Sequence, residues 1–206
     1  AVVPGREYIQ SADTRYEYGL RDKPVIQARD IDETILIDGK LSESAWAEVQ
    51  PVGQFVQKEP FDKMPASEQT EIRVLRDDEN IYFGIMCHDS DPGKIIAKEM
   101  RRDASLLDDD NIEIFLDTFF DRKNCYYFST NPLGAKFDAI ITEEGQNINA
   151  DWNGLWYCKT DINEKGWTAE IAIPYHAIHY KEGLMQWGFN VGRDIRRKNE
   201  DTFWSY

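Results

Sequence analysis

The densest group of reactive side chains lies in Asp108–Asp121, which reads DDDNIEIFLDTFFD and holds six carboxylates around an apolar run. Two carboxylates can act as the acid and base of a glycosidase, and Glu113 and Asp117 are the candidate pair here. Four residues along a strand separate them by roughly 13 Å. Inverting glycosidases need about 6.5–9.5 Å between the carboxyl groups, and retaining ones about 5–5.5 Å. This pair therefore does not predict glycoside hydrolysis.

Other catalytic signatures are missing from the sequence. It contains no GxSxG, phosphate-binding loop or GxGxxG motif. His88, His176 and His179 are scattered, and no carboxylate or cysteine follows the last two at metal-binding spacing. We therefore expect that the chain is not an enzyme.

Acidic turns also offer the oxygen ligands that calcium prefers. An EF-hand starting at Asp108 would place Ile112 and Glu113 where the motif needs an Asx residue and glycine, so the stretch is not an EF-hand. Irregular calcium sites need no such motif, and His88–Pro92 (HDSDP) is a second acidic turn. The candidate ligands of a structural calcium ion are Asp89, Asp91, Asp108 and Asp110. Ordinary solvated turns are the alternative interpretation.

Short aromatic and β-branched runs, separated by turn signals, predict the elements that must position these side chains. The expected strands are Val52–Gln57, Glu71–Leu75, Ile81–His88, Asn111–Thr118, Cys125–Thr130, Phe137–Thr142, Gly154–Thr160, Thr168–Pro174 and Trp187–Ile195. Their even spacing favours an all-β fold, an antiparallel β-sandwich with short helical turns at Ala45–Val49 and at PYHAI. Residues 1–33 are weakly patterned, so we expect an extended N-terminal arm there and the sandwich domain over residues 34–206.

Composition limits the partners of the chain. At 206 residues it can form one domain with a large core. Its net charge of −14 argues against nucleic acid and anionic membrane surfaces as partners. No apolar run reaches the ~18 residues of a membrane span, so direct membrane insertion is not expected. Cys87, Cys125 and Cys158 lie in apolar patterns without CxxC spacing, which favours buried free thiols over a disulfide.

Alternation with period two gives the strand at Asn111–Thr118 two different faces. Its isoleucines and leucine share one face and predict contact with the core. Asn111, Glu113 and Phe115 share the opposite face, which combines hydrogen-bonding groups with a ring. Such a combination can bind a sugar, although a solvated strand would look the same.

Five segments of the chain, in order and with matching spacing, resemble the family 9 carbohydrate-binding module. They are ILIDGKLSESAW (Ile35–Trp46), TEIRVLRDDENIYFGIMCHDSDP (Thr70–Pro92), DDDNIEIFLDT (Asp108–Thr118), GWTAEIAIPY (Gly166–Tyr175) and WGFNVGRDIRRKNEDTFWSY (Trp187–Tyr206). NPLGAKFDA and WNGLW are similar to the subgroup found at the N-terminus of large bacterial envelope proteins. The resemblance covers about Thr34 to Tyr206.

The resemblance implies a β-sandwich with a non-catalytic, glycan-binding role, and structural calcium in some members. It also implies a larger exported protein (periplasmic, outer-membrane-associated or extracellular) with further domains beyond Tyr206 and a link to polysaccharide hydrolysis.

The sugar site of the family carries over only in part. Glu113 matches the family glutamate and Asn131 a family asparagine, but Leu107 stands where sugar-binding members have the first clamping tryptophan. Ser129 replaces a family arginine, and Gly192 a family glutamine. The second clamping tryptophan would lie beyond this chain.

Other groups are therefore expected to complete the site. Trp152, in a loop rich in Asp and Asn, is the candidate stacking residue, and Arg193 could donate to sugar hydroxyls or pair with Glu113. The tryptophans Trp46, Trp156, Trp167 and Trp187 are instead expected in the core. The candidate ligand-binding residues are Glu113, Asn131, Trp152, Arg193, Asn111 and Phe115.

Two alternatives to glycan binding remain open. The chain could be a protein-interaction or assembly domain that kept the fold and lost the sugar clamp. It could also bind haem, as related sandwiches do with Met, His or Lys ligands. Met86 and His88 face the same way on one strand, however, and cannot hold one iron from opposite sides.

Overall fold

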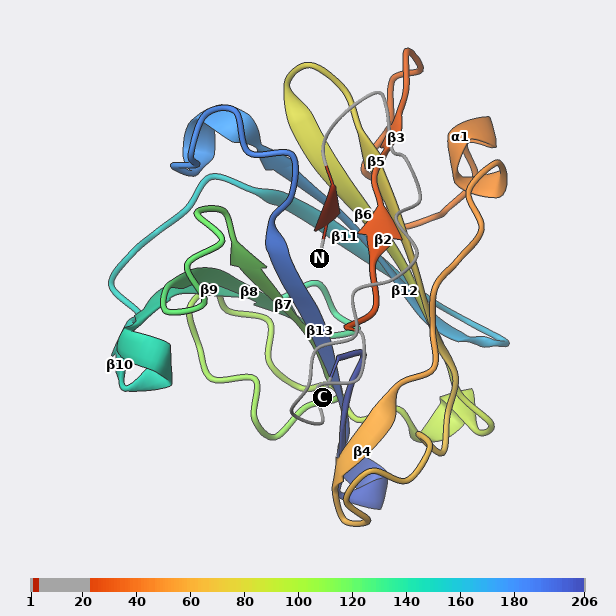
Figure 1. The fold of residues 1–206 in the computed structure, drawn as a ribbon. Coiled ribbons are helices and arrows are strands. Elements are labelled where there is room, and N and C mark those ends of the chain that lie inside the picture. Colours follow the sequence, from red (N-terminus) through yellow and green to blue (C-terminus); the bar gives the residue numbers. More distant parts are fainter. Residues whose placement is uncertain (1, 4–22, 206) are drawn as a thin grey trace.

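The computed structural model describes residues 2–3 and 23–205 and shows two β-sheets packed face to face (Figure 1). The seven-stranded sheet has the order β10-β9-β8-β7-β13-β14-β4. Its strands in that order are Asn147–Asn149, Lys136–Thr142, Cys125–Thr130, Asn111–Asp117, Gly188–Ile195, Glu200–Phe203 and Val56–Glu59. The five-stranded sheet has the order β11-β12-β6-β5-β3. Its strands are Tyr157–Asn163, Gly166–Pro174, Asn80–His88, Thr70–Arg76 and Arg29–Asp30.

The observed strands confirm the predicted β-sandwich. Each of the nine expected strands overlaps an observed one, and β8 has the predicted bounds, Cys125–Thr130. β4 begins at Val56, four residues later than predicted, because Val52 forms only an isolated bridge with Ile72. The short strands β10 and β14 were not predicted, since NIN and EDTF lack the apolar alternation of a strand.

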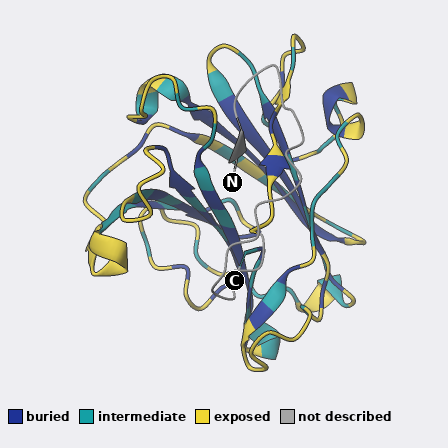
Figure 2. Ribbon diagram, viewed as in Figure 1, coloured by how far each residue is buried: buried dark blue, intermediate teal, exposed yellow. Residues whose placement is uncertain are grey.

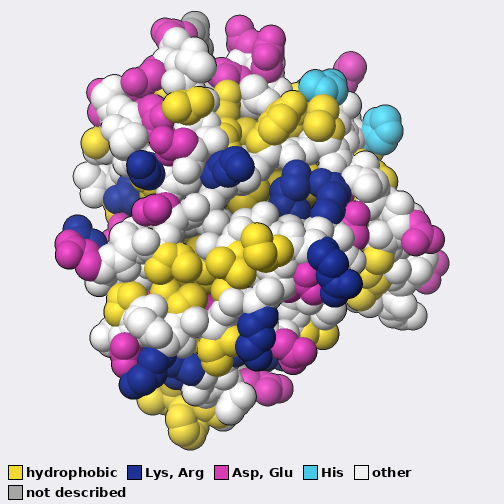
Figure 3. All heavy atoms as spheres, turned by 180° about the vertical axis from the view of Figure 1, so that it is seen from behind, with side chains coloured by type: hydrophobic (Ala, Val, Ile, Leu, Met, Phe, Trp, Pro, Cys, Tyr) yellow, Lys and Arg dark blue, Asp and Glu magenta, His cyan; other side chains and the backbone are white. Residues whose placement is uncertain are grey.

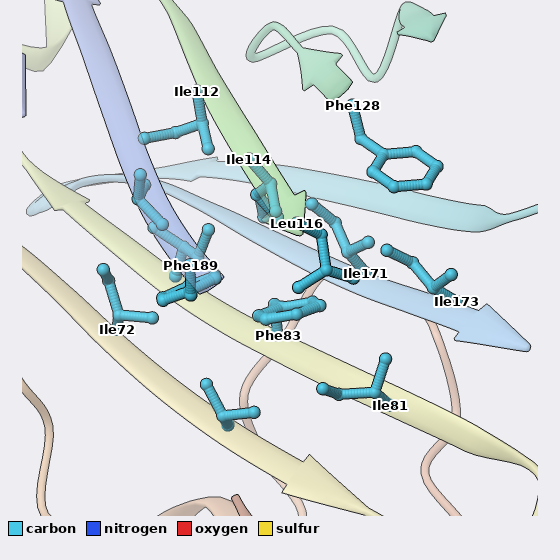
Figure 4. Close-up of a cluster of buried hydrophobic side chains, with 14 of the residues drawn as sticks. Ile72, Ile81, Phe83, Ile112, Ile114, Leu116, Phe128, Ile171, Ile173 and Phe189 are labelled. Atoms are coloured by element: carbon cyan, nitrogen blue, oxygen red, sulfur yellow. The ribbon is translucent and has the colours of Figure 1, made fainter. Parts of the chain in front are cut away.

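The main core fills the space between the two sheets (Figure 4). As predicted, Ile112, Ile114 and Leu116 of β7 point into it and are buried. Phe83 of β6 and Phe189 of β13 stack across the interface with ring centroids 5.4 Å apart. The inner faces of both sheets are buried, whereas the connecting turns are exposed (Figure 2). Trp156, Trp167 and Trp187 lie in this core, as predicted.

A smaller core covers part of the outer face of the five-stranded sheet. The helix α1 (Ser44–Ala47) is shorter than the predicted Ala45–Val49 and places Trp46 over Gly84, where a Cβ atom would come within 2.8 Å of the indole ring. The Trp46 Nε1 donates to the buried carboxylate of Glu170 at 3.0 Å, and the backbone N–H of Gly39 donates to the same carboxylate. These bonds satisfy an acidic group that would be costly to bury alone.

The N-terminal boundary of the packed domain lies earlier than residue 34. Ile26 and Ala28 are buried in the main core, and β3 pairs in parallel with β5 at the edge of its sheet. β2 (Ile26–Gln27) pairs in parallel with β1 (Val2–Val3). Residues 4–22 of the predicted arm lie outside the described residues.

The remaining expectations about the chain as a whole concern thiols and membranes. All three cysteines are free thiols, and burial raises the pKa of Cys87 to about 12. Within the described residues, no helix is long and apolar enough to cross a membrane.

Candidate functional site

A row of aromatic rings crosses the outer face of the seven-stranded sheet. Phe115 of β7 contacts Tyr127 of β8, with ring centroids 5.2 Å apart, and Tyr127 contacts Phe137 of β9 at 5.9 Å. On the other side, Phe203 of β14 lies 6.3 Å from Phe115. All four rings are half-buried. The row therefore offers ring surface to a ligand while its own packing holds it in place.

Glu113 lies beside this row on the same face of β7. Its Oε1 accepts a hydrogen bond from the Tyr127 hydroxyl at 2.6 Å. Burial, with a smaller contribution from the charge of Asp201, raises the pKa of Glu113 above its ordinary value despite this hydrogen bond.

Gly192 of β13 makes room for this arrangement. It stands opposite Glu113 on one side and Phe203 on the other. A Cβ atom at this position would come within 2.8 Å of Glu113 Oε2 and 2.9 Å of the Phe203 ring. The glycine that replaces the family glutamine therefore brings a ring and a carboxylate together across β13.

A second group of charges borders Glu113. Arg196 pairs with Asp194, at 3.0 Å, and with Asp201. Asn111, predicted to share the face of Glu113, donates its amide to Asp194 at 3.0 Å and is buried. Burial and the charge of Glu113 raise the pKa of Asp194 to about 7. The Asn111 amide is therefore used by the buried Asp194 carboxylate and is not offered to a ligand.

A hollow of about 570 Å³ adjoins the aromatic row at Phe115. Its rim carries Arg122, Lys123 and Asn124, which are exposed, and Asn190 of β13 lies in its wall. A volume of this size lies within the range of small-ligand sites. The outer face therefore combines a ring platform, a partly buried carboxylate and an adjacent hollow with hydrogen-bond donors.

Arg193 does not belong to this face, and its predicted placement beside Glu113 was wrong. It stands opposite Ile112 in the β7–β13 register, so its side chain lies between the sheets with the isoleucine. The guanidinium donates to the backbone oxygens of Gln69 and His88, at 3.0 and 2.7 Å, and to the Thr70 hydroxyl at 3.1 Å. Arg193 therefore ties the two sheets together.

Asn131 is also used by the protein itself. Its Oδ1 accepts from the backbone N–H groups of Leu133 and Ala135, and its Nδ2 donates to Asp109 and to the Glu99 carbonyl. The side chain is buried with these bonds made. Its predicted position on the ligand face is therefore corrected to a structural one in the turn after β8.

Trp152 lies on the opposite side of β8 from the aromatic row. Its ring contacts Tyr126 and Phe128, at 5.0 and 5.9 Å, and these two residues face the main core. The prediction that Trp152 stacks a ligand beside Glu113 is not supported by this position. Leu107, which replaces the family tryptophan, is 69% exposed.

Sequence reasoning found Glu113 and Phe115 but missed the rest of the row. Tyr127 of β8 stands outward between the core residues Tyr126 and Phe128, and that alternation was a usable signal. Phe137 and Phe203 come from strands without such a pattern, since KFD and EDTF do not alternate apolar with polar residues. The proximity of these rings depends on the pairing register, which alternation does not give.

The four aspartates predicted to bind calcium do not form one donor set. Both oxygens of Asp89 are taken by Arg197, at 2.6 and 2.8 Å, and Asp91 pairs with Lys94. Asp110 accepts the backbone N–H groups of Arg196 and Ile96, while Asp108 is exposed. Among the described residues, no group of three or more His, Cys, Asp or Glu side chains could hold a metal ion. The arrangement of these four side chains does not fit a calcium ion.

Met86 and His88 lie together on the outer face of the five-stranded sheet. They line a hollow of about 690 Å³ that also contains Glu71 and Arg73. His88 Nε2 lies 3.4 Å from Glu71 Oε1. Met86 and His88 therefore enter this hollow from the same strand, as the two-residue period predicted, and cannot bind one iron from opposite sides.

Comparison with known proteins agrees with this architecture. A family model described as "Carbohydrate family 9 binding domain-like" matches residues 37–201. The chain belongs to this family. The sequence resemblance to the family 9 carbohydrate-binding module is thereby confirmed. No curated protein matches the chain.

Solved structures share the fold at low sequence identity. Two are of a carbohydrate binding module family 9 (CBM9) from Caldicellulosiruptor kristjanssonii, each 17% identical to this chain and covering 85% of it. The complex with cellotriose has a TM-score of 0.60 over 81% of that chain, and the complex with glucose 0.57 over 84%. A putative carbohydrate-binding protein from Bacteroides uniformis ATCC 8492 is 13% identical, with a TM-score of 0.70 over 89% of this chain and 90% of that one. At these identities the likeness shows the fold.

Proposed function

We propose that this module binds a saccharide, without catalysis, on the outer face of its seven-stranded sheet. The observation that carries the proposal is the aromatic row beside Glu113. Sugar rings present apolar C–H faces that pack on aromatic rings, and their hydroxyls need hydrogen-bond acceptors such as a carboxylate. The complexes of the CBM9 structures with cellotriose and glucose support the ligand class.

The proposed site has features that favour weak binding. Leu107 replaces the family tryptophan, and the row consists of phenylalanines and a tyrosine that are already half-buried. Less ring surface is therefore left for a sugar than an exposed tryptophan pair would give. We expect a dissociation constant between the high micromolar and millimolar ranges, or roughly −4 to −6 kcal/mol.

The wider role of the module is also a proposal. The resemblance to the subgroup in bacterial envelope proteins supports a place in a larger exported protein, with this module as its glycan-recognition part. In this role any hydrolysis of a polysaccharide would belong to another part of that protein. The purified module should therefore leave every glycan that it binds uncleaved.

The alternative role as a protein-interaction domain has less support. On the surface shown in Figure 3, hydrophobic side chains form bands with lysines and arginines between them. Obligate protein interfaces expose continuous apolar patches instead, with charged residues depleted at their centre. The face shown does not have that character.

The proposal is tested by a glycan array followed by titration calorimetry with the best ligand. Phe115→Ala should weaken binding about 5-fold to 10-fold, because one stacking ring is lost. Tyr127→Phe keeps the ring and removes the hydrogen bond to Glu113. Its effect on binding therefore measures the contribution of that hydrogen bond apart from the contribution of the ring. Phe119→Ala is the matched control, since Phe119 is exposed and lines a hollow with Tyr126 and Ile140 rather than with the aromatic row.

The melting temperature of each variant shows whether weaker binding comes from a lost contact with the ligand or from a less stable fold. Weakened binding with unchanged melting in Phe115→Ala, and normal binding in Phe119→Ala, would support the site. A wild-type module that binds no glycan on the array, or a Phe115→Ala variant that binds like wild type, would refute it. In the first case the interaction-domain role would become the leading one.

A further inference from the structure

A second groove lies at one end of the sandwich, at residues other than those of the outer-face site. Its volume is about 800 Å³, within the range of small-ligand sites. It is formed by the β5–β6 turn, the first residue of β11, the 3-10 helix at Tyr175–Ala177 and the loop that follows. We call it the tyrosine groove, after Tyr157, Tyr175 and Tyr180, which line it.

The tyrosine groove presents ring surface to solvent. Tyr157 is 51% exposed and Tyr180 is 43% exposed. The Tyr180 ring packs on the buried Trp187, with centroids 5.8 Å apart, and on Tyr175 at 6.1 Å. Tyr175 in turn lies 6.2 Å from Trp187. Tyr180 is therefore both exposed and supported from behind, as a stacking platform needs to be.

Hydrogen bonds hold the walls of the groove to both sheets. The backbone N–H of Tyr175 donates to the carbonyl of Glu79, in the β5–β6 turn, at 2.8 Å. The N–H of His179 donates to the Tyr126 hydroxyl at 2.9 Å, and its carbonyl accepts from the Thr118 hydroxyl at 2.6 Å. The loop is thus tied to the seven-stranded sheet as well, which lowers the entropy lost when a ligand binds.

Carboxylates are the most numerous charged groups at the groove, beside His176 and His179 in its lining and Arg76 near the Tyr175 hydroxyl. Asp78, Glu79 and Glu182 line it, and among its described lining residues none is a lysine or an arginine. By contrast, the hollow beside Phe115 carries Arg122 and Lys123. Aromatic faces and carboxylates both attract a cation, whereas this lining would repel an anionic sugar such as a uronic acid.

From these features we propose that the tyrosine groove is a second binding site, for a saccharide that carries protonated amino groups. The C–H face of the sugar ring packs on Tyr157 or Tyr180. Its ammonium groups lie near the rings and the carboxylates of Glu79 and Glu182. The proposal does not depend on the outer-face site, because the two share no lining residue.

Nuclear magnetic resonance titration of the whole chain tests the proposal. The probe is the tetramer of β-1,4-linked glucosamine, at a pH where its amines are protonated, and the N-acetylated tetramer is the neutral comparison. The glucosamine tetramer should shift the imidazole signals of His176 and His179 and the ring signals of Tyr157. It should bind at least about 10-fold more tightly than the neutral tetramer, and about 3-fold more weakly when the ionic strength is raised from 20 to 200 mM.

Variants separate a built site from general attraction to an acidic protein. Tyr157→Ala should weaken binding of the glucosamine tetramer about 5-fold, and Glu182→Gln about 3-fold. Glu164→Gln, at an exposed carboxylate in the β11–β12 turn, is the control and should leave binding unchanged. Both groove residues are exposed, so folding should be preserved.

Three outcomes would overturn the proposal. Equal binding of the two tetramers would show that the amine is not recognised. Equal weakening by Glu164→Gln would show that only the overall negative charge attracts the probe. Signal changes confined to the aromatic row of β7, β8, β9 and β14, and lost in Phe115→Ala, would place the ligand at the outer-face site and leave the tyrosine groove without a role.

Discussion

Asp194 is the residue whose substitution tests most directly how the outer-face site is built. Its carboxylate is buried beside Glu113 and Asp201, and Arg196 and Asn111 compensate only part of the cost. The pKa of Asp194 is therefore about 7 instead of its ordinary 3.8. Asp194→Asn removes the ionisable group and keeps the size of the side chain, including an oxygen that can accept from Asn111.

The sign of the effect follows from proton binding. Between pH 4 and pH 7 the folded protein keeps the Asp194 proton that the unfolded chain releases, so the free energy of unfolding falls as pH rises through this window. At ~1.4 kcal/mol for each pH unit between 3.8 and 7, the upper limit of this loss is ~4 kcal/mol. Loss of the contact with Arg196 offsets part of the gain in the variant. We expect Asp194→Asn to be about 1–3 kcal/mol more stable than wild type at pH 8 and nearly equal to it at pH 4.

Urea unfolding followed by tryptophan fluorescence, at half-unit steps from pH 4 to pH 8, measures this difference. Asp151→Asn is the control, since Asp151 is exposed and its removal should leave the pH profile unchanged. A variant that is less stable than wild type by the same amount at every pH would refute the reasoning, because the Arg196 pair would then outweigh the burial of the charge. A wild-type stability that does not fall between pH 4 and pH 7 would refute it as well.

Two further predictions concern the charged groups that proved structural. Arg193→Ala should cost about 3–5 kcal/mol of unfolding free energy, because it leaves two carbonyls and a hydroxyl between the sheets without their donor. Arg101→Ala, at an exposed arginine, should leave the free energy of unfolding nearly unchanged. Urea unfolding compares the two variants, and equal costs would contradict the inter-sheet role of Arg193. The melting temperature should be the same in millimolar calcium as in EDTA, because Arg197 already neutralises Asp89. A higher melting temperature in calcium, abolished by Asp89→Asn, would instead establish a calcium site.

The sequence was sufficient for nine of the strands and for the two faces of β7. In β7 the alternation of isoleucine and leucine with Asn111, Glu113 and Phe115 is a local property, because successive side chains of an extended chain point to opposite sides. The same reasoning correctly put Trp167 and Trp187 in the core. The ordered motifs were also sufficient for the family, since they span most of the chain.

The positions of residues from different strands required the tertiary structure. Alternation divides the side chains of β13 between two faces but does not say which face meets the core. A shift of one residue in the pairing with β7 would send the opposite set of side chains into the core. Arg193 stands opposite Ile112 and Gly192 opposite Glu113, so the arginine enters the core and the glycine reaches the outer face. Trp152, in a loop, is placed by its contacts with Tyr126 and Phe128, and no periodicity governs a loop.

The sequence by itself thus determined the β-sandwich, the family and the outward direction of Glu113 and Phe115. Only the tertiary structure decided that Tyr127, Phe137 and Phe203 surround them, and that the tyrosine groove forms from three separate segments of the chain. The physical reason is the range of the forces involved. Side-chain alternation and turn preference act over a few residues. Strand register and loop placement are set by packing between residues far apart in the sequence, such as Arg193 and Thr70, which are 123 positions apart.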